Sequence, residues 1–176
     1  DAIQNACAGN RGFWGIVESR AFGCYFADCS AADGPGIAEQ IKQQVTATSA
    51  GATLTIGIAG YPTLDYQKGQ ILENACKALV HARYFLPDAT VAFDAVSLNI
   101  SGDALYESGD VEAAIQEFKS ALLLDPANDN VHNSLGVCYG VLGEYQQALD
   151  EFEATMALKP SETFAIYNAG LANKLL

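Results

Sequence analysis

AVSLNISGDALYESGDVEAAIQEFKSALLLDPAN occupies residues 95–128, and DNVHNSLGVCYGVLGEYQQALDEFEATMALKPSE follows it at residues 129–162. The two segments agree at five positions that lie 34 residues apart, and a third copy begins at residue 163. Agreement in several columns at one period indicates an internal repeat. The matched residues are Gly102, Gly136 and Gly170; Gly109 and Gly143; Ala114 and Ala148; Phe118 and Phe152; and Pro126 and Pro160.

Each repeat is predicted to be a pair of antiparallel helices. Small residues at Gly102 and Ala114 allow the two helices of a pair to cross closely, and Phe118 fills the space between pairs. Gly109 provides the turn within the pair. Pro126 ends the second helix, because the residue before a proline avoids the helical region. The second helices are expected to begin near Val111 and Tyr145.

These residues resemble the tetratricopeptide repeat (TPR) family, whose small, aromatic and proline positions recur every 34 residues. The resemblance covers residues 95–176, with repeats at 95–128 and 129–162 and a partial repeat at 163–176. It implies an all-α superhelix whose concave groove, lined mainly by the first helix of each repeat, binds peptides or other protein segments. The groove residues that it implies are Asn99, Asp103, Tyr106, Asn133, Val137 and Tyr167.

The composition of this groove favours a neutral or basic protein or peptide as partner. One branch of the family holds a partner's C-terminal carboxylate with lysine, arginine and asparagine side chains. Here Asn99 and Asp103 stand where that clamp would have Lys and Asn, and the cations are absent. Residues 95–176 carry 12 acidic and 3 basic side chains, a net charge of −9. In the alternative interpretation, these side chains are solvated or pack on the first domain.

The partial third repeat is apolar around much of its predicted helix. A repeat array usually ends in a helix with a polar outer face. We therefore expect a cover for this segment, from Thr163 to Leu176, either by further repeats or by a contact between copies of the chain. The apolar residues are Ile166, Ala169, Leu171, Leu175 and Leu176.

Residues 1–94 are predicted to form a second domain, which makes the chain α+β. The order helix, hairpin, helix, strand, helix, strand predicts a two-layer α/β sandwich with a mostly antiparallel sheet. Trp14 is expected in its core, and an open sheet edge would allow two copies to pair. The hairpin strands are expected at 13–18 and 21–27, the other strands at 53–60 and 90–93, and the later helices after residue 34 and at 69–84.

Two motifs in this half resemble the GGDEF domain of bacterial diguanylate cyclases, which make cyclic di-GMP. TLTIGIAGYP at 53–62 and ACKALVHAR at 75–83 match the apolar pattern of its C-terminal half. The resemblance places Arg20 where the family has a metal-binding acid, and a cation there would repel divalent metals. Cys76 and Val80 replace the family's helix Asp and Tyr. It therefore implies a degenerate, incomplete module with no catalytic residues, no metal and no cofactor.

Composition excludes other classes of partner. A net charge of −12 disfavours nucleic acid and anionic membranes, and the apolar runs stop short of the roughly 18 residues of a membrane span. Five cysteines without CxxC pairing and two histidines do not indicate a zinc site. Cys24, Cys76 and Cys138 fit buried thiols, which indicates a reducing, cytoplasmic compartment.

Together these features predict a non-catalytic scaffold or adaptor of bacterial type that binds other proteins through its TPR groove. Two alternatives remain open at the level of the sequence. In the first, the N-terminal module senses GTP or cyclic di-GMP and passes the signal to the repeats. In the second, the repeats drive assembly of the chain with itself.

Overall fold

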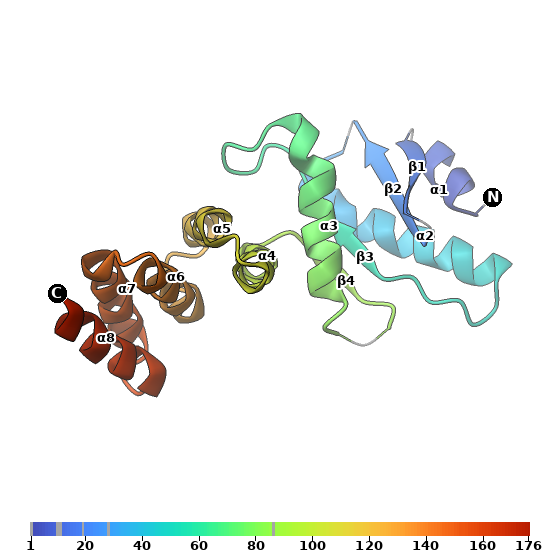
Figure 1. The fold of residues 1–176 in the computed structure, drawn as a ribbon. Coiled ribbons are helices and arrows are strands. Elements are labelled where there is room, and N and C mark those ends of the chain that lie inside the picture. The colour runs from blue at the N-terminus through green and yellow to red at the C-terminus, as the bar shows by residue number, and fades with distance from the viewer. Residues whose placement is uncertain (1, 10–11, 19, 28, 86) are drawn as a thin grey trace. The chain divides into compact units, whose positions relative to one another are not determined.

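The chain divides into two compact units, Asp1–Phe93 and Asp94–Leu176, in the computed structural model (Figure 1). The structure describes residues 2–9, 12–18, 20–27, 29–85 and 87–176. No helix among these described residues is both long enough and apolar enough to cross a membrane.

The N-terminal unit contains helices and strands in the predicted order of helix, hairpin, helix, strand, helix, strand. Its longer helices each bury one face, with Ile41 of the second helix and Ala78 of the third inside. The elements are α1 Ala2–Gly9, β1 Gly12–Glu18, β2 Ala21–Phe26, a 3-10 turn at Ala31–Asp33, α2 Gly34–Thr48, β3 Ile56–Ile58, a 3-10 turn at Lys68–Gln70, α3 Ile71–Ala82 and β4 Thr90–Ala92.

The strands form two separate pairs, which corrects the prediction of one mostly antiparallel sheet. β1 and β2 pair antiparallel as the predicted hairpin, whereas β3 and β4 pair parallel with each other. The physical reason is the connection, because β3 reaches β4 through α3, and a helical crossover brings the second strand back in the same direction. Trp14 on β1 is 42 % exposed, so the prediction that it lies in the core is also wrong.

Close packing of α3 on β3 explains why a glycine interrupts the apolar strand. A Cβ added at Gly57 would lie 2.2 Å from the carbonyl oxygen of Ala75 and 2.3 Å from the amide nitrogen of Leu79, both in α3. Only a residue without a side chain permits this approach. On the other side, Lys42 of α2 pairs with Asp88 at 3.6 Å and ties that helix to the loop before β4.

The C-terminal unit consists of five helices that stack as successive antiparallel pairs (Figure 1). The second helices begin at Val111 and Tyr145, as predicted from the repeat. Gly109 and Gly143 adopt left-handed φ values of 89° and 78° at the turns within the pairs. The helices are α4 Ala95–Ser108, α5 Val111–Leu124, α6 Asp129–Val141, α7 Tyr145–Leu158 and α8 Thr163–Leu175.

The repeated glycines and phenylalanines contact each other inside each pair. A Cβ at Gly102 would lie 2.5 Å from the ring of Phe118, and one at Gly136 would lie 2.6 Å from the ring of Phe152. At Gly170, by contrast, an added Cβ meets no atom within 4 Å. The predicted role of these small residues in close helix crossing is therefore confirmed for the two complete repeats.

Candidate interaction surface

The first helices of the repeats, α4, α6 and α8, contact one another in sequence and form what we call the first-helix surface. Positions 34 residues apart occupy the same place on these helices. The surface is therefore best described in columns that run across the three helices. The four columns are Asn99, Asn133 and Tyr167; Asp103, Val137 and Leu171; Val96, Asn130 and Phe164; and Glu107, Val141 and Leu175.

Three polar side chains connect α4 to α6 in the middle of this surface. The amide of Asn99 donates to the carboxylate of Asp103, one helical turn away, at 3.5 Å. The hydroxyl of Ser134 on α6 donates to the other oxygen of Asp103, also at 3.5 Å. The structure therefore brings the predicted residues Asn99 and Asp103 together, and places Asn133 next in sequence to the serine that bridges the two helices.

Two asparagines of this surface carry side-chain oxygens that no described residue satisfies. Oδ1 of Asn99 and Oδ1 of Asn133 are both buried and accept no hydrogen bond within the described part of the chain. An unsatisfied buried carbonyl costs about 1–3 kcal/mol, and such groups are rare in native proteins. The two oxygens occupy the same column on neighbouring helices, so the repeat presents this acceptor twice.

Asp103 sits in an environment that opposes its negative charge. Burial raises the pKa of this carboxyl above its ordinary value, and the charge of Glu107 raises it further, while the hydrogen bond from Ser134 acts in the opposite direction. Neither of its two printed hydrogen-bond donors carries a positive charge. A cation or a good N–H donor arriving at this point would therefore be attracted to the carboxylate.

The α8 end of the surface is apolar and exposed. Phe164 is 72 % exposed, Tyr167 70 % and Leu171 46 %, and Leu175 continues the line. Their spacing of three and four residues places them on one face of α8. Tyr106 on α4 and Val137 on α6, the remaining predicted residues, are respectively exposed and half-buried.

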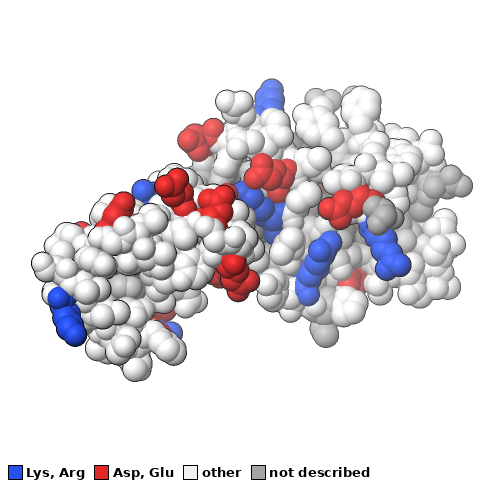
Figure 2. Space-filling view, viewed as in Figure 1, with Lys and Arg blue, Asp and Glu red and all other residues white. Residues whose placement is uncertain are grey.

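The sequence prediction missed part of this surface. Ser134 lies between the predicted columns, and nothing in the repeat pattern singled it out. Phe164, Leu171 and Leu175, however, are the third-repeat members of columns whose positions could be read from the 34-residue period. Figure 2 shows acidic side chains distributed over the visible face of this unit.

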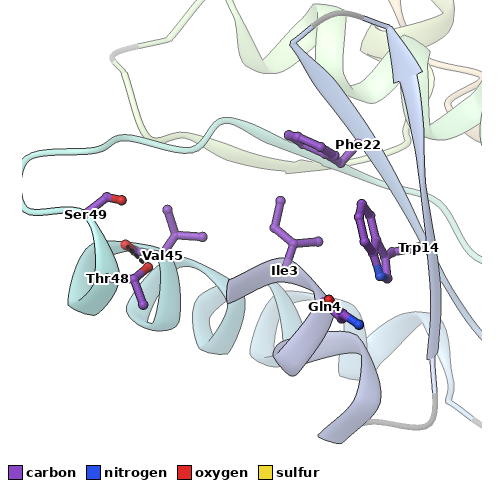
Figure 3. A pocket seen from close by; sticks show the side chains of 7 residues that line it. All are labelled: Ile3, Gln4, Trp14, Phe22, Val45, Thr48 and Ser49. Atoms are coloured by element: carbon purple, nitrogen blue, oxygen red, sulfur yellow. Dashed lines mark hydrogen bonds between the residues drawn. The ribbon is translucent and has the colours of Figure 1, made fainter. Parts of the chain in front are cut away.

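A separate hollow of about 440 Å³ lies in the N-terminal unit, between α1, the hairpin and the end of α2 (Figure 3). Trp14 and Phe22 of the hairpin stand next to each other, with ring centroids 6.2 Å apart. Arg20 is exposed just before β2. The residues that line the hollow are Ile3, Gln4, Trp14, Phe22, Val45, Thr48 and Ser49.

Comparison with known proteins identifies the repeats. Residues 102–143 match the family model described as TPR repeat. A curated relative, the BBSome complex member bbs-4 of Caenorhabditis elegans, is 34 % identical over 89 residues, which is 51 % of this chain and 19 % of the relative. The matched segment thus spans about a fifth of that relative's length. These findings support the prediction that the C-terminal part of the chain carries TPR repeats.

Solved structures of helical-repeat proteins are similar over part of the chain. The second TPR domain of Spaghetti (RPAP3), bound to an HSP90 peptide, is 22 % identical with a TM-score of 0.46, covering 46 % of this chain and 75 % of that one. The MamA protein is 20 % identical with a TM-score of 0.48, covering 82 % of this chain and 66 % of that one. Both TM-scores lie below 0.5, so these likenesses alone establish neither the fold nor a function. The family match lies wholly in the C-terminal unit, and the GGDEF resemblance of residues 1–94 stays a prediction.

Proposed function

We propose that the chain is a non-catalytic scaffold that binds an extended polypeptide segment, neutral or basic in charge, on its first-helix surface. The single observation that carries this proposal is the pair of unsatisfied oxygens on Asn99 and Asn133. Peptide N–H groups along an extended segment are regularly spaced donors, and a pair of acceptors on successive repeats suits them.

The charge of the surface supports a basic rather than an acidic partner. Asp103 and Glu107 lie on α4, and Asp103 has two printed hydrogen-bond donors, both uncharged. An acidic peptide would add a further negative charge next to a carboxylate that burial already disfavours. A lysine or arginine side chain would instead lower the pKa of Asp103 and gain a charge-assisted hydrogen bond.

The curated relative supports a role in assembly. Its name describes bbs-4 as a member of a complex, and it shares 34 % identity over half of this chain. Helical-repeat arrays present extended surfaces on which other proteins dock. The exposed aromatic residues Phe164 and Tyr167 are of the type that anchors protein interfaces.

A selection from a random peptide library displayed on phage tests the proposal. We expect the enriched peptides to be basic and to contain apolar residues, and their binding to weaken as salt is raised. Asn99→Ala and Asn133→Ala should each reduce the affinity of the enriched peptides by about tenfold, the equivalent of about 1.4 kcal/mol. Asn173→Ala, on another face of α8, is the matched control. Enrichment of acidic peptides, or binding that both variants leave unchanged, would refute the proposal.

Self-association is a second candidate, favoured by the apolar surface of α8. Ile166, Leu171 and Leu176 are about half exposed or more. A dimer that buries this helix should dissociate when Ile166→Glu and Leu171→Glu are combined, as measured by sedimentation equilibrium. A monomer at all concentrations would exclude this function. Isothermal calorimetry with GTP and with cyclic di-GMP tests the sensing alternative in the same preparation.

A further inference from the structure

Two cysteines of the N-terminal unit contact each other although they are distant in sequence. Cys7 lies on α1 and is fully buried, and Cys24 lies on β2 and is half-buried. The two thiols are within hydrogen-bonding distance of one another. The other three cysteines lie elsewhere, with Cys29 exposed in a loop, Cys76 on α3 and Cys138 on α6.

The geometry of the hairpin explains why these two side chains meet. Cys24 is the cross-strand partner of Trp14, so both side chains lie on the same face of the hairpin. α1 packs against that hairpin. Figure 3 shows Ile3 and Gln4 of α1 across from Trp14 and Phe22. Cys7, one turn beyond Ile3 and Gln4, is thereby directed towards Cys24.

We propose that Cys7 and Cys24 are a modification site, at which an oxidant of the disulfide class joins them in a reversible intramolecular disulfide. With glutathione disulfide, the thiolate of one cysteine attacks the oxidant, forms a mixed disulfide and releases one glutathione. The second cysteine then attacks the mixed disulfide and releases the other glutathione. The balance is two protein thiols and one glutathione disulfide consumed, with one protein disulfide and two reduced glutathiones formed.

The bond would fix α1 to the hairpin and hold one wall of the hollow in Figure 3. The segment between the cysteines, residues 8–23, contains β1 and the turn of the hairpin. Closing this loop restricts the unfolded chain and so stabilises the N-terminal unit. The oxidised protein should therefore resist unfolding better than the reduced protein, and the reductant should reverse the effect.

The environment of the pair makes the reaction slow at neutral pH. Burial, together with the hydrogen bond from Cys7, raises the pKa of the Cys24 thiol to about 12. Since the thiolate is the attacking species, oxidation should accelerate as the pH rises. Cys29, which is exposed, is expected to react with the same oxidant first.

The experiment uses the full chain carrying Cys29→Ser, incubated with excess glutathione disulfide under native conditions. Trypsin places Cys7 in the peptide 1–11 and Cys24 in the peptide 21–42, which also contains position 29. We expect mass spectrometry to find these two peptides joined, with the loss of two hydrogen atoms. We also expect quenching of the fluorescence of Trp14, which is the chain's single tryptophan and faces Cys24 across the hairpin.

Controls separate this pairing from chance oxidation. Cys7→Ser and Cys24→Ser should each abolish both the linked peptides and the quenching, and oxidation of the denatured chain should give mixed pairings instead of one. Stable glutathione adducts at Cys24 without closure to Cys7 would overturn the proposal. So would a native chain in which both thiols stay reduced at pH 9 in excess oxidant, or one in which Cys7 links to another cysteine. Because the mapping is done on a chain with both thiols present, poor folding of a serine variant does not affect the decision.

Discussion

Replacing the repeated glycines by alanine should have opposite effects at equivalent positions. At Gly102 and Gly136 the new Cβ would lie 2.5 Å and 2.6 Å from the buried rings of Phe118 and Phe152. Carbon atoms in contact prefer about 3.5–4.0 Å, so each ring has to move by about 1 Å. Overpacking of this kind costs about 1–3 kcal/mol.

The intrinsic preference of alanine for helices offsets part of that cost, by about 1 kcal/mol. We therefore expect Gly102→Ala and Gly136→Ala to lower the free energy of unfolding by about 1–2 kcal/mol. Gly170→Ala, where a Cβ meets no atom within 4 Å, should raise it by up to about 1 kcal/mol. The comparison needs no other change, since all three glycines lie at the same place in a helix.

Urea unfolding followed by circular dichroism at the helical band measures these changes in the full chain. Trp14 lies in the N-terminal unit, so its fluorescence transition is an internal control that should stay constant. Phe118→Leu combined with Gly102→Ala should show a favourable coupling energy, because the smaller side chain leaves room for the Cβ. If Gly170→Ala destabilises the chain as much as Gly102→Ala does, the steric reasoning is refuted.

Three further predictions concern the polar groups of the C-terminal unit. His132 places Nδ1 2.6 Å from Glu151 and Nε2 3.1 Å from the carbonyl oxygen of Pro126, so His132→Ala should lower the free energy of unfolding by about 1–3 kcal/mol in urea titrations; no loss would mean that the ring links nothing. Burial and, secondly, the charge of Asp103 raise the pKa of Cys138 from 9.0 to about 11. Because the folded-state pKa is the higher one, the stability that this thiol contributes is complete below pH 9 and is lost as the pH rises to about 11. Thermal unfolding should therefore fall less steeply over that range in Cys138→Ala. Asp103→Asn should lower the pKa of Cys138, measured from the ultraviolet absorbance of the thiolate, and an unchanged value would show that the two groups do not interact.

The repeats were predictable because the sequence uses each structural position more than once. Two glycines facing two phenylalanines at one period require the same contact twice, and the helix starts at Val111 and Tyr145 followed directly. Nothing comparable exists in the N-terminal unit. There the apolar alternation of residues 53–60 indicated a strand, but only Ile56–Ile58 is paired, because its partner Thr90–Ala92 is equally short.

Pairing between strands depends on contacts that alternation does not encode. β3 and β4 are joined through α3 and therefore run parallel, whereas β1 and β2 are joined by a tight turn and run antiparallel. The candidate surface was partly predictable for a related reason. Asn99 and Asn133 followed from the repeat, but the bridge from Ser134 to Asp103 depends on how two repeats stack, which no single repeat specifies.

The columns of the first-helix surface change in character from α4 to α8, and this gives the surface a direction. The column that starts with Asp103 continues with Val137 and Leu171, and the one that starts with Glu107 continues with Val141 and Leu175. The asparagine column ends in Tyr167, which is exposed. A polypeptide lying across the three helices would therefore meet carboxylates at one end and apolar side chains at the other. A partner segment with a basic residue at one end and apolar residues at the other can satisfy both ends in only one orientation. Reversing the order of residues in such a peptide keeps its composition and charge but should weaken its binding, which distinguishes reading by this surface from general attraction to an acidic protein.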